Sequence, residues 1–202
     1  MTLAEVLILD WFQSLYSPTL NEIASFITSL GNNEIVIVSI LFLMTLLLKY
    51  GLHNWALALS ISAGGSFVTV QLLKEWVQRI RPETALIEIS SYSFPSGHAA
   101  IGISLYVLIG LFIYRYHSKL GGALLMIIGC LIGLSRVYLG VHFPTDVIGG
   151  WIIGLVWLLV AYAYLAHHLQ KEKESRPLYS RLWTITLIVF WFIYWISYNI
   201  SL

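Results

Sequence analysis

Long apolar runs alternate with short polar segments along most of this chain. A helix that crosses a bilayer needs about 20 mostly apolar residues, with a range of roughly 17–25. Segments that reach or approach this length are 33–49, 55–77, 99–114, 122–139, 147–166 and 182–200. The pattern predicts an all-α fold, an integral membrane bundle of six transmembrane helices.

The first 30 residues have a different pattern, in which acidic and apolar positions are mixed. Asp10, Pro18 and Glu22 interrupt the apolar residues. This favours an N-terminal interfacial helical segment, broken near Pro18, over a seventh span. No lysine or arginine occurs in this segment, which argues against a cleaved signal peptide because such a peptide has a basic start.

Composition supports a membrane protein. Hydrophobic residues make up 58% of the 202 residues and charged residues only 10%, whereas soluble domains have about 25% charged residues. We expect a single integral membrane domain over residues 1–202. A net charge of +1 without a basic run gives no indication of nucleic-acid binding, and no obligate protein partner is evident. Cys130 is the only cysteine, so an internal disulfide is excluded and a packing role is predicted.

The distribution of basic residues between the two sides of the bundle predicts its orientation. With six spans, one set of loops carries seven basic residues: Lys49, Arg115, Lys119, Lys171, Lys173, Arg176 and Arg181. The other set carries four: Lys74, Arg79, Arg81 and Arg136. Cytoplasmic loops are the ones enriched in lysine and arginine, so the second set is predicted to face away from the cytoplasm.

Pairs of glycines four residues apart occur at Gly129 and Gly133 and at Gly150 and Gly154. Small residues at this spacing let two helices approach closely. We interpret both pairs as packing sites within the chain rather than as a dimer interface.

The first polar cluster is KEWVQRIRP, which runs from Lys74 to Pro82. Lys74 and Arg81 are seven residues apart and would share one helix face. Proline disfavours helix at the residue before it, so we expect the helix to end near Arg81. These cations could bind an anion, or they could simply extend to the membrane interface. The second interpretation is preferred for Arg79.

The second cluster is FPSGHAA, which opens the third predicted span. A helix start leaves free backbone N–H groups that can bind an anion. Ser96 adds a hydroxyl donor, Gly97 allows close approach to the backbone, and His98 follows directly. An ordinary helix cap with an incidental histidine explains the same pattern.

The third cluster is SRVYLGVHFPTD, with Arg136, His142 and Asp146. The Pro-Thr-Asp sequence is typical of a helix start, and an aspartate near a histidine can fix its tautomer. Asp146 could equally be only a capping residue. However, all three clusters are predicted to meet on one side of the membrane, where buried charges usually have a function.

Together these residues suit a phosphate group. Cationic side chains would neutralise its oxygens. One neutral histidine could attack phosphorus while the other protonates the leaving oxygen. The sequence has no carboxylate cluster suited to Mg²⁺, so we expect neither a metal nor another cofactor, and cations would stabilise the developing charge.

These residues resemble the three motifs of the type 2 phosphatidic acid phosphatase family, which shares its site with vanadium haloperoxidases and glucose-6-phosphatase. The family motifs K-x6-R-P, P-S-G-H and S-R-x5-H-x3-D appear within residues 74–146, in order and with intact spacing. The resemblance implies a catalytic set and a phosphate-binding set. The catalytic set is His142 as nucleophile, Asp146 as its partner and His98 as acid and then base. The phosphate-binding set is Lys74, Arg81, Ser96, Gly97 and Arg136.

The resemblance also implies a lipid phosphate or diphosphate substrate, presented from the bilayer. Undecaprenyl diphosphate, phosphatidylglycerophosphate and phosphatidic acid are the expected candidates, with the site on the extracytoplasmic side of a bacterial inner membrane. Two alternatives stay open. A phosphotransferase would pass phosphate from a lipid diphosphate to another lipid through the same site. A non-catalytic lipid-binding or flipping protein would be expected to lack one of His98, His142 and Asp146, all of which are present.

Overall fold

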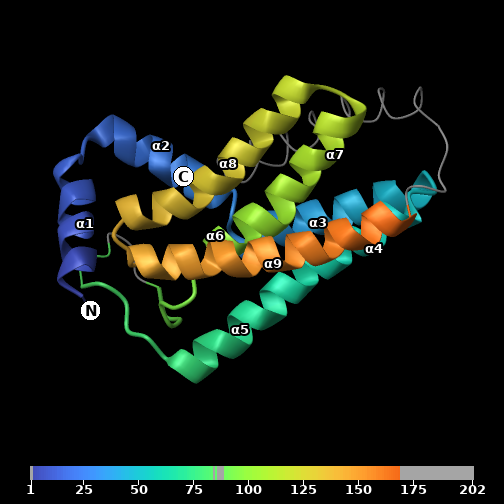
Figure 1. Ribbon diagram of the computed structural model, residues 1–202. Helices are drawn as coiled ribbons and strands as arrows, with labels where there is room; N and C mark the ends of the chain where they lie inside the picture. Colours follow the sequence, from blue (N-terminus) through green and yellow to red (C-terminus); the bar gives the residue numbers. More distant parts are fainter. Residues whose placement is uncertain (1, 84, 86–88, 169–202) are drawn as a thin grey trace.

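Every regular element that the computed structural model describes is a helix (Figure 1). The described residues are 2–83, 85 and 89–168. The α-helices are α1 (Leu3–Ser14), α2 (Pro18–Ser29), α3 (Asn33–Lys49), α4 (His53–Leu59), α5 (Gly65–Val77), α6 (Gly97–Ile101), α7 (Leu108–Tyr116), α8 (Lys119–Tyr138) and α9 (Pro144–His168). Two π-helical turns, Ser60–Gly64 and Gly102–Val107, join α4 to α5 and α6 to α7. The predicted all-α class is confirmed for these residues.

Within the described residues, four continuous helices are long and apolar enough to cross a membrane. They are His53–Val77, Gly97–Tyr116, Lys119–Tyr138 and Pro144–His168. These helices correspond to the second, third, fourth and fifth predicted spans, with ends that differ by a few residues.

The first and last predicted spans have different outcomes. Helix α3 matches the segment 33–49, but it reaches spanning length only together with α2, to which it is joined at a bend of 45°. Counting this bent pair as one span gives up to five in the described residues. The sixth predicted span, 182–200, lies outside the described residues.

The N-terminal segment forms two short helices, and the break falls at the predicted proline. Pro18 occupies the first position of α2, where its missing N–H is not needed. The Ser17 hydroxyl caps the same helix by accepting a hydrogen bond from the N–H of Leu20 at 3.2 Å. Helix α1 exposes an apolar face that includes Leu3, Leu7 and Trp11. Such a face suits the predicted position at the membrane interface.

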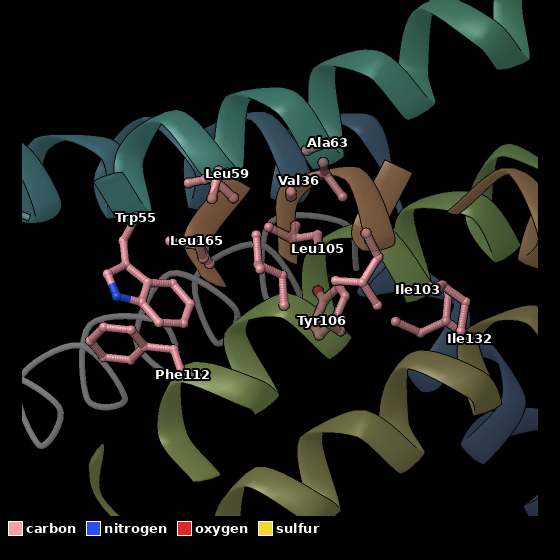
Figure 2. Close-up of a cluster of buried hydrophobic side chains, with 14 of the residues drawn as sticks. Val36, Trp55, Leu59, Ala63, Ile103, Leu105, Tyr106, Phe112, Ile132 and Leu165 are labelled. Carbon is pink, nitrogen blue, oxygen red and sulfur yellow. The ribbon is translucent and has the colours of Figure 1, made fainter. Parts of the chain in front are cut away.

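The main apolar core lies between α4, α7, α9 and the two π-helical turns (Figure 2). The Trp55 and Phe112 rings meet edge to face with centroids 4.7 Å apart, a favoured geometry for aromatic pairs. Tyr106 projects from the second π-helical turn, and its hydroxyl donates to the carbonyl of Leu30 at 2.6 Å. This bond ties the corner between α2 and α3 to the bundle.

Both glycine pairs pack within the chain, as predicted. A Cβ atom added at Gly129 would collide with the carbonyl of Gly102, and one added at Gly133 would collide with the indole of Trp151. Cβ atoms added at the other pair, Gly150 and Gly154, would collide with the backbone carbonyls of Ser96 and Ala100, respectively. Helices α8 and α9 are therefore held at backbone contact distance against the segment formed by Ser96, α6 and the first residue of the π-helical turn that follows it.

Substituting Gly129 by alanine is expected to destabilise the bundle by about 1–3 kcal/mol, because the added methyl group overpacks a backbone contact. Gly121 is a matched control on the same helix, since a Cβ there would make only ordinary contacts from 3.5 Å. Gly121→Ala should be neutral or slightly stabilising, as alanine is the better helix former. Unfolding midpoints measured in detergent compare the two variants, and equal midpoints would contradict the packing account.

Candidate active site

A cavity of about 550 Å³ opens where α5, α6 and α8 meet the corner between α2 and α3. It collects residues from all three sequence motifs, although these are far apart along the chain. The motif residues that line it are Lys74, Arg81, Gly97, His98, Arg136 and His142. Ser96 and Asp146, the other two predicted site residues, are fully buried and do not line the cavity.

His142 lies in the short turn between α8 and α9. Gly140 adopts a positive φ of 68° in this turn, a conformation that glycine accepts without strain. The side chain of His142 is only 2% exposed, and its Nε2 atom lies 3.1 Å from Nη1 of Arg81. A guanidinium group can only donate, so Nε2 must be the acceptor and carry the lone pair. The proton is thereby assigned to Nδ1.

The Nδ1 side of His142 faces Asp146. The distance from Nδ1 to Oδ2 of Asp146 is 3.5 Å, and the hydroxyl of Ser93 lies 3.4 Å from the same nitrogen. A hydrogen bond of full strength would be shorter, and such contacts often tighten when a ligand binds. The pair thus has the orientation in which a carboxylate stabilises the Nδ1 proton while Nε2 stays unprotonated.

Burial and charge keep this histidine neutral. Burial lowers the pKa of His142, the hydrogen bond to Asp146 opposes that shift, and Arg81 and Arg136 reinforce it, so that the pKa is about 4. At neutral pH the imidazole therefore holds a free electron pair. Burial also lowers the pKa of Arg81 from its ordinary value, and the charge of Asp146 opposes this, but an arginine stays protonated in proteins.

Asp146 is held by several donors at the first turn of α9. Its Oδ1 accepts from Nη1 of Arg79 at 2.7 Å. Its Oδ2 accepts from the Ser93 hydroxyl at 2.6 Å and from the N–H of Phe143 at 2.9 Å. A carboxylate at a helix N-terminus is further stabilised by the helix dipole. Asp146 is thus a fixed negative charge behind His142.

Three cations face the cavity, and all are held by uncharged groups. Lys74 donates to the carbonyl of Tyr92. Arg81 donates to the carbonyls of Ser91 and Val141, both at 2.8 Å. Arg136 donates to the Thr28 hydroxyl at 2.8 Å, and its buried Nε has no hydrogen-bond partner within the described residues. In this part of the chain none of the three forms an ion pair with a carboxylate. A buried charge of this kind favours an anionic ligand.

The structure corrects the predicted end of the first motif's helix. Helix α5 ends at Val77, not near Arg81, because Gln78 adopts a left-handed conformation with φ of 51°. Lys74 and Arg81 therefore do not share a helix face. They converge because both donate to the carbonyl of Tyr92.

His98 is held by the corner between α2 and α3. Its Nε2 lies 3.2 Å from Oδ1 of Asn32. Its ring packs against Gly31, where an added Cβ would come within 2.6 Å of Cδ2. The second position of α6 thus brings His98 to the cavity that His142 also lines. Ser96 caps this helix by accepting from the N–H of Ala99 at 3.4 Å.

Three polar residues of the site were missed by the sequence interpretation, and a fourth, Arg79, was given the wrong role. Asn32 contacts His98, Ser93 contacts Asp146, and Glu5 reaches the same network through Arg79. The interpretation of Arg79 as a flanking residue that extends to the interface is wrong, because it forms ion pairs with both Glu5 and Asp146. The only feature of the sequence that could have indicated a role for Arg79 in the site was its position two residues before Arg81. Among residues 2–83, 85 and 89–168, no group of three histidine, cysteine or acidic side chains could hold a metal ion.

Comparison with known proteins gives consistent matches. The model of the PAP2 superfamily matches residues 54–170, which include all three motifs. Phosphatidylglycerophosphatase B of Bacillus subtilis is 36% identical over 146 residues, 69% of this chain and 72% of that protein. An undecaprenyl-diphosphatase of Sulfolobus acidocaldarius is 32% identical over 67% of this chain and 66% of its own length. The crystal structure of a transmembrane PAP2-type phosphatidylglycerolphosphate phosphatase from Bacillus subtilis has a TM-score of 0.74 and 32% identity, covering 82% of this chain and 86% of that one.

Proposed function

Because this chain belongs to the PAP2 superfamily, we propose that it is an integral membrane phosphatase that hydrolyses a lipid phosphate or diphosphate taken from the bilayer. The observation that carries the proposal is the cavity itself. There, three cations that lack a carboxylate partner in the described residues surround a neutral histidine whose unprotonated nitrogen accepts a hydrogen bond from Arg81.

The first chemical step is attack of His142 Nε2 on phosphorus. The new N–P bond forms as the bond from phosphorus to the leaving oxygen breaks, and His98, in its protonated imidazolium form, gives a proton to that oxygen and becomes neutral. Asp146 stabilises the positive charge that develops on the imidazole. The lone pair on Nε2 and the 3.5 Å approach of Nδ1 to Asp146 support these roles.

The second step returns the enzyme to its starting state. His98, now neutral, takes a proton from water, whose oxygen attacks the phosphohistidine and breaks the N–P bond. Throughout, Lys74, Arg81 and Arg136 neutralise the phosphoryl oxygens, as fixed positive charges do at other phosphoryl-transfer sites. Gly97 lines the cavity beside them, and Ser96 supports it by capping α6.

The substrate is proposed from the relatives. The two curated relatives are named for phosphatidylglycerophosphate and undecaprenyl diphosphate, so both lipids, with phosphatidic acid, are the candidates here. The excess of basic residues that the six-span prediction assigns to the opposite side, seven against four, supports a site that faces outward from a bacterial inner membrane.

Phosphate release from these three lipids by purified protein in detergent, with excess chelator, tests the proposal. We expect release to continue with chelator present, because cationic side chains stabilise the charge, and to favour one lipid. A Mg²⁺-dependent phosphatase serves as the control that chelation is complete. Activity that returns only when Mg²⁺ is added would contradict the mechanism. Phosphate found on a second lipid instead of in water would identify a phosphotransferase.

A further inference from the structure

We propose that Glu5 and Arg79 are positioning residues for the His142–Asp146 pair, which makes the N-terminal helix α1 a working part of the active site. The inference rests on the proposed function, because it assigns these residues to the same phosphatase reaction. It is carried by a chain of polar contacts that runs from α1 to His142 through Glu5 and Arg79, neither of which is a defining residue of the three motifs.

Arg79 is the centre of this chain of contacts. Its Nη1 donates to Asp146 Oδ1 and to the Thr145 hydroxyl, both at 2.7 Å. Its Nη2 donates to Glu5 Oε1 at 2.7 Å, and its guanidinium lies 4.2 Å from the centroid of the Phe143 ring. Because these contacts come from several directions, they hold the Arg79 side chain in a single conformation. By holding Oδ1, Arg79 leaves Oδ2 of Asp146 to face His142.

Glu5 connects the network to α1. Only 5% of the residue is exposed, and it also accepts hydrogen bonds from the Thr145 hydroxyl and, in the helix cap, from the N–H of Thr2. Burial raises the pKa of Glu5, but the hydrogen bonds from Thr145, Arg79 and Thr2 outweigh it and lower the pKa to about 2. A glutamate that is held as a carboxylate at this depth serves as the counter-charge of Arg79.

The packing of helix α1 places Glu5 next to the turn that carries His142. Figure 1 shows it beside the end of α8 and the start of α9, with which it is in contact. Leu9, one turn after Glu5, packs in a buried cluster with Val137, Phe143 and Val147. These residues flank the turn that carries His142, so docking of α1 fixes the site through both apolar and polar contacts.

Negative and positive charges alternate along this chain of contacts, from Glu5 through Arg79 to Asp146. Removing Glu5 or Arg79 is therefore predicted to shift the pKa of His142 in opposite directions. Glu5 offsets the charge of Arg79, so in Glu5→Gln the arginine acts more strongly on Asp146 and the pKa of His142 should fall. In Arg79→Gln the carboxylate of Asp146 is uncovered, and the pKa of His142 should rise. The other charged or titratable groups that face His142 are Lys74, Arg81, His98 and Arg136, and they are the same in both variants.

The acid limb of kcat/KM reports the titration of the free enzyme's essential base. For Glu5→Gln the limb should move to lower pH, and for Arg79→Gln to higher pH, each by roughly half to one pH unit for a charge at this range. The double variant should return close to the wild type, and Arg79→Lys should keep most of the wild-type profile. Glutamine is also accepted in a capping box, so Glu5→Gln should leave α1 capped. Asp10→Asn, an exposed acid on the same helix, is the control and should not shift the limb.

Rates per folded enzyme, with unfolding midpoints alongside, separate positioning from stability. If the wild type is active, opposite shifts of the acid limb in Glu5→Gln and Arg79→Gln support the inference. Acid limbs that do not move, or that move in the same direction in both variants, overturn the inference even where the variants are less stable. A wild type that releases no phosphate from any lipid would instead overturn the proposed function, so the two failures are distinguishable.

Discussion

His142→Ala is expected to abolish phosphate release, with a loss of at least about 10⁴-fold in turnover, as for other enzymes that lose a covalent nucleophile. The reason is specific to the geometry of the site. Arg81 fixes the lone pair of His142 Nε2 on the cavity side, and Asp146 lies on the proton side. Removing the imidazole removes the atom that we propose forms the bond to phosphorus, while the three cations are expected still to bind the substrate.

The measurement is phosphate release by the folded, detergent-extracted variant, with a thermal unfolding curve to establish that it is folded. His53→Ala is a matched control, because His53 is exposed at the start of α4, at the far end of the span that carries Lys74. It should retain wild-type activity. Full activity in His142→Ala would eliminate the phosphohistidine mechanism.

The membrane spans could be predicted because they depend mainly on one physical quantity, the length of an uninterrupted apolar run. A run of apolar side chains long enough to cross the bilayer is visible in one sequence, and α8 and α9 lie within a few residues of their predicted limits. The convergence of the motifs could be predicted for a related reason. Ionisable groups such as Arg136 and His142 are costly near a membrane, so their clustering at span ends indicates a shared site.

The contacts that complete the site could not be predicted, because long-range packing creates them. Glu5 meets Thr145 across 140 positions of sequence, and no local pattern indicates such a partner. The seven-residue spacing of Lys74 and Arg81 suggested one helix face, yet the backbone leaves the helix at Gln78. The expected convergence was right, but it arises from a loop carbonyl rather than from helix periodicity.

The loop that carries Ser91 and Tyr92 helps to explain how the buried Lys74 and the half-buried Arg81 are tolerated before substrate binds. Its carbonyls accept hydrogen bonds from Lys74 and Arg81, so these charges are solvated by dipoles without being neutralised. Phosphate oxygens are stronger acceptors for a cation than a neutral carbonyl. An arriving phosphate group would therefore exchange with these contacts instead of having to displace a carboxylate.

His98→Ala should separate the two steps of the reaction. On a lipid phosphate or diphosphate the alkoxide or phosphate is a poor leaving group that needs a proton. Turnover by His98→Ala should therefore fall by about 10²–10⁴-fold. On p-nitrophenyl phosphate the leaving phenolate needs no proton, so attack by His142 should stay fast. The phosphohistidine would then persist, because His98 also activates the water of the second step. The expected result is a burst of one nitrophenolate per site, followed by a slow phase.

Rapid-quench measurement of nitrophenolate, together with labelled phosphate bound to the protein, tests this directly. A phosphoramidate is stable in base and labile in acid, so the label should be retained only under alkaline conditions. The double variant His98→Ala with His142→Ala should show neither burst nor label, which ties both signals to His142. Equal losses on both substrates without a burst would mean that His98 only shapes the cavity. In that case Asn32, whose Oδ1 lies 3.2 Å from Nε2 of His98, would be holding the ring for packing and not for proton transfer.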